Sequence, residues 1–263
     1  MQAAERFARD GFFIAPGVIP PEILLRVRPR IDAVYRGEYE TGTVPSRNVE
    51  PTSAGPGRLV KIDNSHRSDR VILELVSHPQ IGRLAAAITG ATTVQVFATQ
   101  LLIKPPTEGD AGNVGWHQDQ EYWDAALEGE LFTAWVAVSD VTADSGPMRF
   151  VQGSHRWGLL RSGDFFSGDL ETLKARFKAK QGGDWREVPA ILPPGGVSFH
   201  HRLTVHGSGP NQSSGLRISF AVHLRTEKSG LRPGVKFQDA GYLSDFDDPV
   251  GSPVCYRAQE REV

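Results

Sequence analysis

The spacing of apolar residues in the first third of the chain predicts helices. Residues 2–36 contain two short segments predicted to be helical, with an extended stretch between them. The first segment ends at Gly11, and glycine is typical of helix ends. Residues 69–90 have apolar residues three and four positions apart with a break at Pro79, which predicts a pair of helices. Between these regions, residues 40–58 are rich in Gly, Pro, Ser and Thr and are predicted to form a surface loop.

From residue 92 onward the pattern changes to short runs of β-type residues separated by turns. Many short strands behind a helical start predict an antiparallel sandwich or barrel of the jelly-roll type, with helices that cover one sheet. The predicted strands are residues 93–104, 114–119, 131–140, 148–153, 197–201, 204–209 and 216–224.

Nothing in the pattern divides the chain, so we predict one domain over residues 1–263. Its helical part covers about residues 1–90 and its jelly-roll core about residues 92–226. Residues 161–187 resemble an insertion between strands, with a helix predicted at 169–180. Such an insertion at the mouth of the fold is either a lid over a site or a tolerated excursion, and the sequence leaves both open.

Composition excludes several classes of protein. The formal net charge of −2 gives no sign of a nucleic-acid-binding surface, and no apolar run reaches the length of about 18 residues that a membrane span requires. Cys255 is the single cysteine, so an internal disulfide is impossible. The first residues do not resemble an export signal. We therefore expect a cytoplasmic protein, and its charge and composition fit a monomer or a homodimer equally well.

A histidine and a carboxylate two positions apart are the first chemical signal. His117 and Asp119 stand in the stretch GWHQDQEYW, and in an extended strand residues i and i+2 point to the same face. The two side chains would then converge on one point, where each offers a lone pair to a metal ion. Two histidines with one carboxylate are typical of non-haem Fe(II) oxygenases. Taken alone, this short motif is common by chance and is better explained as a hydrogen-bonded surface pair than as a metal site.

The third ligand would have to be one of the other histidines. His206 is the best placed, because it ends a β-type run and precedes Gly-Ser-Gly, whose small residues permit close approach of a ligand. His200 and His201 lie in the same segment. The remaining histidines have plainer interpretations: a surface position for His66 and His78, structural hydrogen bonding or a place at the rim of the site for His155, and a buried core position for His223.

Arg217 adds a different kind of signal. It lies in the apolar strand LRISFAVHL, eleven residues after His206, and a guanidinium that points inward from a strand requires an anion. Arginine suits bidentate binding of a carboxylate, which the cosubstrate 2-oxoglutarate carries at its far end. An internal salt bridge and an exposed strand edge are the alternative explanations.

Together these blocks resemble the phytanoyl-CoA dioxygenase family of Fe(II)- and 2-oxoglutarate-dependent oxygenases. The resemblance runs from about Asp10 to Leu224 and rests on separate blocks that occur in order with compatible spacing. It implies a double-stranded β-helix, the jelly-roll fold of cupins, preceded by helices. The blocks are LLIKPP, WHQDQEYW, AWVAVSDVTADSGPMRFVQGSHRWG, VSFHHRLTVHGSGPN and LRISFAVHL.

The resemblance also implies roles for individual residues. His117, Asp119 and His206 would bind iron, and Arg217 would form a salt bridge with the distal carboxylate of 2-oxoglutarate. Gln118 is expected to face away from the metal. Further contacts to the cosubstrate are implied for Ser208, Trp135, Gln100 and Lys61.

The implied reaction consumes Fe(II)-bound 2-oxoglutarate and O2 and hydroxylates a C–H bond of a small molecule, with release of succinate and CO2. Related halogenases have a small residue in place of the metal-binding carboxylate, so Asp119 favours hydroxylation. The same cofactors driving desaturation, epimerisation or cyclisation, and a metal-binding jelly roll without turnover, are alternatives. Trp116, Tyr122 and Trp123 are candidates for contact with the substrate, and no motif indicates a CoA thioester.

Overall fold

The computed structural model describes residues 3–49, 58–107, 109–110, 112–181, 184–239, 241 and 243–259, so residues 50–57 of the predicted surface loop lie outside the described part. The helices predicted in the first third of the chain are confirmed. They are α1 (Ala3–Asp10), α2 (Pro21–Tyr35), α4 (Arg70–Val76) and α5 (Pro79–Thr89).

Local chemistry accounts for where these helices begin. Pro21 occupies the first turn of α2, where its missing N–H costs no hydrogen bond. Asp69 caps α4 by accepting hydrogen bonds from the backbone N–H groups of Val71 and Ile72. The later helical segments are α6 (Gln120–Trp123), α7 (Leu170–Gln181) and the 3-10 turns η1 (Ser65–Arg67), η2 (Ser154–Trp157) and η3 (Phe237–Asp239).

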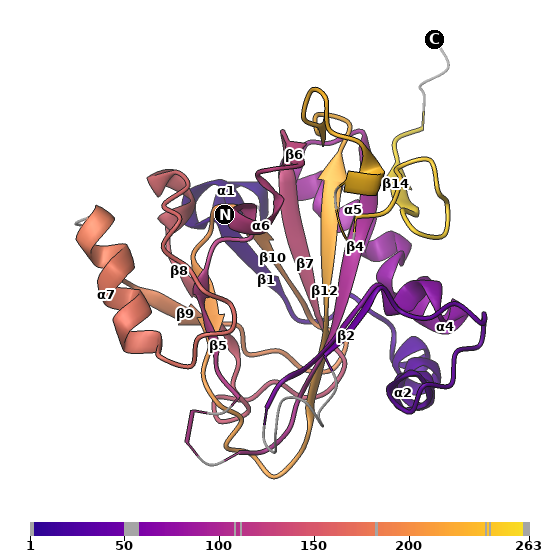
Figure 1. Ribbon diagram of the computed structural model, residues 1–263, viewed down its shortest axis with the longest axis horizontal. Coiled ribbons are helices and arrows are strands. Elements are labelled where there is room, and N and C mark those ends of the chain that lie inside the picture. Colours follow the sequence, from indigo (N-terminus) through magenta and orange to yellow (C-terminus); the bar gives the residue numbers. More distant parts are fainter. Residues whose placement is uncertain are drawn as a thin grey trace.

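Two antiparallel sheets form the centre of the molecule (Figure 1). The larger sheet has the order β1-β10-β7-β12-β4-β3-β2, with β14 paired to β4, and the smaller has the order β5-β11-β8-β9. The predicted mainly β fold of the jelly-roll type, with N-terminal helices, is confirmed. The strands of the larger sheet are β1 (Phe12–Ala15), β2 (Arg47–Val49), β3 (Val60–Asp63), β4 (Thr93–Lys104), β7 (Leu131–Ala137), β10 (Val197–His201), β12 (Arg217–Thr226) and β14 (Val254–Arg257). Those of the smaller sheet are β5 (Val114–His117), β8 (Met148–Val151), β9 (Glu187–Pro189) and β11 (His206–Ser208), and β6 (Leu127–Glu128) pairs with β13 (Gly230–Leu231).

The alternation of side chains in the larger sheet separates a helix-facing core from the space between the sheets. In β12, Ile218, Phe220, Val222 and Leu224 belong to the core that packs against α2, α4 and α5. The intervening residues, including Arg217, therefore point toward the smaller sheet. Figure 1 shows α2 and α4 beyond the larger sheet and α7 on the opposite side of the molecule, beside the smaller sheet. The residues of β12 that alternate with the core residues therefore face the space between the two sheets.

No helix in the described part of the chain combines the length and apolar character that a membrane crossing requires.

The predicted surface position of His66 is wrong. The side chain is 1% exposed, and its ring lies 2.8 Å from Thr99 Oγ1 and 3.1 Å from the backbone oxygen of Gly251. It joins η1 and β4 to the C-terminal segment. Because that segment returns from almost 200 residues away in sequence, the local pattern around His66 gives no sign of it.

Acidification is expected to destabilise the protein through His66. Burial lowers its pKa to about 4, whereas an unfolded histidine has a pKa of about 6.5. Below pH 6.5 the unfolded chain therefore binds a proton that the folded chain excludes, and stability falls with pH. We expect a loss of about 2 kcal/mol by pH 5 from this residue. Urea unfolding at pH 7.5 and pH 5.0 tests this: the loss should shrink in His66→Gln, and an equal loss in that variant would contradict the assignment.

Candidate functional site

His117 and His206 face each other across the smaller sheet. They are direct partners in the pairing of β5 with β11, and their ring centres lie 4.1 Å apart. Nδ1 of His117 lies 2.8 Å from the backbone oxygen of Gly115, and Nδ1 of His206 lies 2.9 Å from that of Thr204. A carbonyl oxygen only accepts, so both Nδ1 atoms carry the proton. In the neutral form of each ring, Nε2 is then the lone-pair donor.

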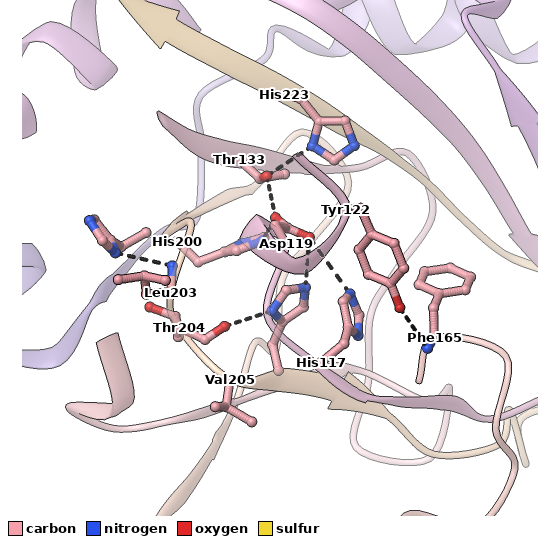
Figure 2. Close-up of polar contacts among 12 residues, drawn as sticks. His117, Asp119, Tyr122, Thr133, Phe165, His200, Leu203, Thr204, Val205 and His223 are labelled. Atoms are coloured by element: carbon pink, nitrogen blue, oxygen red, sulfur yellow. Dashed lines mark hydrogen bonds and ion pairs between the residues drawn. The ribbon is translucent and has the colours of Figure 1, made fainter. Parts of the chain in front are cut away.

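Asp119 reaches the same point by a different route from the one predicted. The strand expected over residues 114–119 ends at His117, and Asp119 has helical dihedral angles, φ −54° and ψ −36°, at the start of α6. The chain turns after the histidine, and this turn brings the carboxylate back. Asp119 Oδ1 lies 3.6 Å from His117 Nε2 (Figure 2) and 3.5 Å from His206 Nε2. The three potential ligand atoms lie within 4.8 Å of one another, which fits a single divalent cation.

The second oxygen of Asp119 is held by two donors from the larger sheet. Thr133 Oγ1 lies 2.7 Å and His200 Nε2 lies 3.1 Å from Asp119 Oδ2. Thr133 on β7 pairs in register with His200 on β10 and with His223 on β12, so the three side chains form a row across the sheet. Figure 2 shows Thr133 between Asp119 and His223. This row fixes the carboxylate so that Oδ1 faces the two histidines.

The protonation states suit a metal site. Burial alone would raise the pKa of the Asp119 carboxyl, but the surrounding imidazoles, His206 first, hold that pKa well below its usual value. Burial lowers the pKa of His206 well below the usual value, so His206 is a neutral ligand at physiological pH. Burial also lowers the pKa of His223 to about 4, and this ring is neutral as well.

An inner cavity adjoins the three residues and has the buried Arg217 in its wall, while Lys104 lies behind the wall residue Ser208. Arg217 is 2% exposed and Lys104 is fully buried. Lys104 Nζ donates to Ser208 Oγ and to the backbone oxygen of Gly209, both at 2.6 Å. Burial, with Arg217 nearby, lowers the pKa of Lys104 well below its ordinary value. Within the described part of the chain, no carboxylate forms an ion pair with either cation.

Two donor atoms in the wall of this inner cavity lack hydrogen-bond partners among the described residues. They are Arg217 Nε and Trp135 Nε1. Arg217 also lies over the ring of Trp135, 5.2 Å from its centre, and one of its terminal nitrogens donates to Ser219 Oγ at 3.0 Å. Burying such donors without an acceptor is costly, so the site fits a carboxylate-bearing molecule. Of the predicted cosubstrate contacts, the structure places Ser208, Trp135 and Gln100 in this cavity with Arg217.

A second cavity, called here the outer cavity, also borders His117 and Asp119. Lys61 lies here, away from the Arg217 group that the resemblance associates with the cosubstrate, and it forms an ion pair with Asp63. The predicted substrate contacts Tyr122 and Trp123 line this cavity. Its other lining residues are Gln100, Phe165, Phe166 and His223.

The segment 161–187 contributes Phe165 and Phe166 to this wall. Phe165 packs against His117 with ring centres 5.2 Å apart, and its backbone N–H donates to the Tyr122 hydroxyl at 3.0 Å. Its backbone oxygen accepts a hydrogen bond from the N–H of Gly115. Phe165 therefore holds this part of the segment against His117 and β5. Whether it opens as a lid stays a prediction.

Gly115 is where β5 and this segment come into closest contact. A Cβ atom at this position would stand 1.9 Å from the backbone oxygen of Asp164 and 2.7 Å from Leu173 Cδ1. Gly115→Ala is expected to lower the free energy of unfolding by about 1–3 kcal/mol, because the segment must shift. Urea unfolding checks this, with Gly168→Ala as the control, since its Cβ would meet nothing nearer than 3.6 Å. Equal stability of the two variants would contradict the tight contact.

Two residues of the motif stretch lie apart from the cavities. Trp116 points to the opposite face of β5, where its ring packs edge-on against Trp185, so the structure does not bring it to the site. The side chain of Gln118 points away from the three residues, as predicted from the strand pattern. It donates to the backbone oxygens of Gly158 and Leu203, both at 2.8 Å, and thereby anchors the turn that leads to Asp119.

The family model for Phytanoyl-CoA dioxygenase (PhyH) matches residues 7–219, most of the chain. This chain belongs to the phytanoyl-CoA dioxygenase family. The resemblance predicted from the sequence blocks is thereby confirmed. The match ends two residues after Arg217, so it includes every residue of the inner cavity except Ala221 and His223.

Individual relatives are similar at moderate identity. The human peroxisomal phytanoyl-CoA dioxygenase is 24% identical over 83% of this chain, and the match spans 66% of that relative's length. L-proline trans-4-hydroxylase from Streptomyces griseoviridis is 25% identical over 84% of this chain and 85% of its own length. Among solved structures, the epimerase SnoN in complex with Fe3+, alpha ketoglutarate and nogalamycin RO has a TM-score of 0.69 at 24% identity, covering 90% of this chain and 88% of that one. This structural likeness shows the shared fold.

Several site residues escaped the sequence reasoning. Lys104 stands in the quoted block LLIKPP, and the two-residue alternation of β4 places it on the same face as Gln100, so that signal was available. Thr133 and His200 had no local signal, because their convergence on Asp119 depends on the register between strands.

Proposed function

We propose that this chain is an Fe(II)- and 2-oxoglutarate-dependent oxygenase that hydroxylates a C–H bond of a small molecule. The observation that carries the proposal is the buried cation Arg217 in the wall of the cavity that His117, Asp119 and His206 also line, with Lys104 hydrogen-bonded to Ser208 in the same wall. A protein that only bound a metal would have no use for a dicarboxylate anchor there. Family membership supports the same class of chemistry.

Different residues would bind the iron and the 2-oxoglutarate. His117 Nε2, His206 Nε2 and Asp119 Oδ1 would hold the iron, since these atoms are lone-pair donors that face one point. Arg217 and Lys104 would hold the distal carboxylate of 2-oxoglutarate, with the Ser208 hydroxyl beside them. Bound iron and 2-oxoglutarate supply the oxidising chemistry that activates O2 and releases succinate and CO2. The aromatic wall of the outer cavity would exclude water and orient the substrate.

The test separates binding from turnover. Anaerobic addition of Fe(II) and then 2-oxoglutarate should give a weak visible charge-transfer absorption and raise the midpoint of thermal unfolding. Admission of O2 should then release succinate. Binding of Fe(II) without any effect of 2-oxoglutarate would favour a non-catalytic metal-binding jelly roll and contradict the proposal. Product analysis distinguishes hydroxylation from desaturation, epimerisation or cyclisation, which use the same cofactors.

A further inference from the structure

The hydrogen-bonded row beneath Asp119 determines which nitrogen of His223 carries its proton. Asp119 Oδ2 only accepts, so the single hydroxyl proton of Thr133 is donated to it over 2.7 Å. Thr133 Oγ1 then has only lone pairs for His223 Nδ1, which lies 3.0 Å away. Nδ1 of His223 must therefore carry the proton. The other nitrogen of this neutral ring, Nε2, is a hydrogen-bond acceptor.

That acceptor has no partner in the described part of the protein. His223 is 3% exposed, and its Nε2 is buried without a hydrogen bond. Its ring is fixed between Phe97 and Trp123, with ring centres 5.9 Å and 4.9 Å away. The residue lines both the inner and the outer cavity. A rigid, buried acceptor in a cavity wall is suited to an N–H or O–H group of a bound molecule.

The wall of the outer cavity also contains one cation and one anion. Lys61 Nζ donates to both carboxylate oxygens of Asp63, at 2.7 and 2.9 Å, and the two side chains are 11% and 2% exposed. The ammonium group has three protons, and the third makes no hydrogen bond among the described residues. Lys61 can therefore donate to a carboxylate, while Asp63 and His223 Nε2 accept from a positively charged nitrogen.

We propose that the outer cavity binds a small zwitterionic substrate, a free amino or imino acid, with its carboxylate on Lys61 and its nitrogen on Asp63 and His223 Nε2. The inference rests on the proposed oxygenase function. One cation and one anion match the two charges of such a molecule, and the aromatic rings of Tyr122, Trp123 and Phe165 receive its apolar part.

The experiment uses the Fe(II)-loaded protein with 2-oxoglutarate and measures succinate release. The probes are the twenty common amino acids including L-proline, their N-acetyl and methyl-ester derivatives, and palmitoyl-CoA. At least one free amino or imino acid should raise succinate release about tenfold or more. Its N-acetyl and ester forms should be poor activators. Activation by none of the free acids, or by palmitoyl-CoA instead, would overturn the proposal.

Variants then test the assigned contacts. His223→Asn retains an N–H donor near the Nδ1 position for Thr133 but lacks the Nε2 acceptor, and should raise the KM for the activating acid about 10- to 100-fold without a matching rise for 2-oxoglutarate. The double variant Lys61→Gln/Asp63→Asn keeps the hydrogen-bonded pair without its charges. It should raise the KM for the free acid and leave that for the methyl ester little changed. His78→Asn, outside both cavities at the start of α5, is the control.

Two failures have different meanings. If Fe(II) and 2-oxoglutarate produce neither the charge-transfer absorption nor succinate, the proposed oxygenase function is wrong. If both appear but His223→Asn changes the two KM values together, or the double variant affects the acid and the ester equally, only the substrate assignment is overturned.

Discussion

Replacing Arg217 with methionine is expected to abolish cosubstrate binding while making the cosubstrate-free protein more stable. The guanidinium is 2% exposed and forms no ion pair within the described part of the chain, although burial lowers its pKa only to about 10, so it remains charged. Removing a buried charge that has no partner should raise the free energy of unfolding by about 1–4 kcal/mol. Losing one partner of the buried pair with 2-oxoglutarate should weaken binding by about 3–5 kcal/mol, or roughly 10²- to 10⁴-fold.

Urea unfolding with and without Fe(II) and 2-oxoglutarate measures both effects. The wild-type protein should gain about 2.7 kcal/mol at a cosubstrate concentration one hundred times its Kd, and Arg217→Met should gain almost nothing at that concentration. Arg225→Met is the matched control, because Arg225 lies on the same strand but bonds to Gln95 Oε1 and to the backbone of Ser229, outside both cavities. Equal protection of Arg217→Met and wild type would show that the distal carboxylate binds elsewhere.

A smaller effect is expected at the neighbouring cation. Lys104 donates to Ser208 and Gly209 even without a ligand, so its charge is partly compensated. Its contribution to cosubstrate affinity should therefore be weaker than that of Arg217. This difference follows from the structure alone, since the sequence singled out Arg217 and passed over Lys104.

The alternation of side chains explains why much of the site could be predicted. In β12, every second residue faces the helices, so an arginine at position 217 and a histidine at position 223 had to face the other way. The same alternation places Gln100 beside the inner cavity from β4. For these residues the strand pattern carries the information, and the family blocks add the chemical role.

The rest depends on features that a linear pattern does not contain. Asp119 reaches the metal-binding position through a helical turn after a four-residue strand, although the strand pattern suggested the same outcome for a different reason. His200 and Thr133 meet Asp119 because three strands align in one register. Trp116 has the aromatic character of a substrate contact, but it lies on the face of β5 opposite to His117. Register and turn geometry are set by tertiary packing.

The row formed by Thr133, His200 and His223 also predicts that Asp119→Asn will reduce activity as much as Asp119→Ala. Thr133 and His200 both donate to Oδ2, so an asparagine must place its amide oxygen there to accept both hydrogen bonds. Its NH2 group would then occupy the position of Oδ1, toward His117 and His206, where it has no lone pair for a metal. Both variants should lose Fe(II) affinity and reduce succinate release by about 10³-fold or more, corresponding to several kcal/mol.

Two variants at His200 test whether the hydrogen bonds to Oδ2 orient the side chain of residue 119. His200→Leu removes one donor from Oδ2 and should reduce Fe(II) affinity about 10- to 100-fold, whereas His200→Gln offers an N–H near the same position and should recover part of the loss. The measurements are anaerobic Fe(II) titration and succinate release. Wild-type Fe(II) affinity in Asp119→Asn would contradict the argument, because the amide would then have turned its oxygen to the metal despite both donors. Equal affinities of the Leu and Gln variants would show that His200 acts through packing rather than through its hydrogen bond to Asp119.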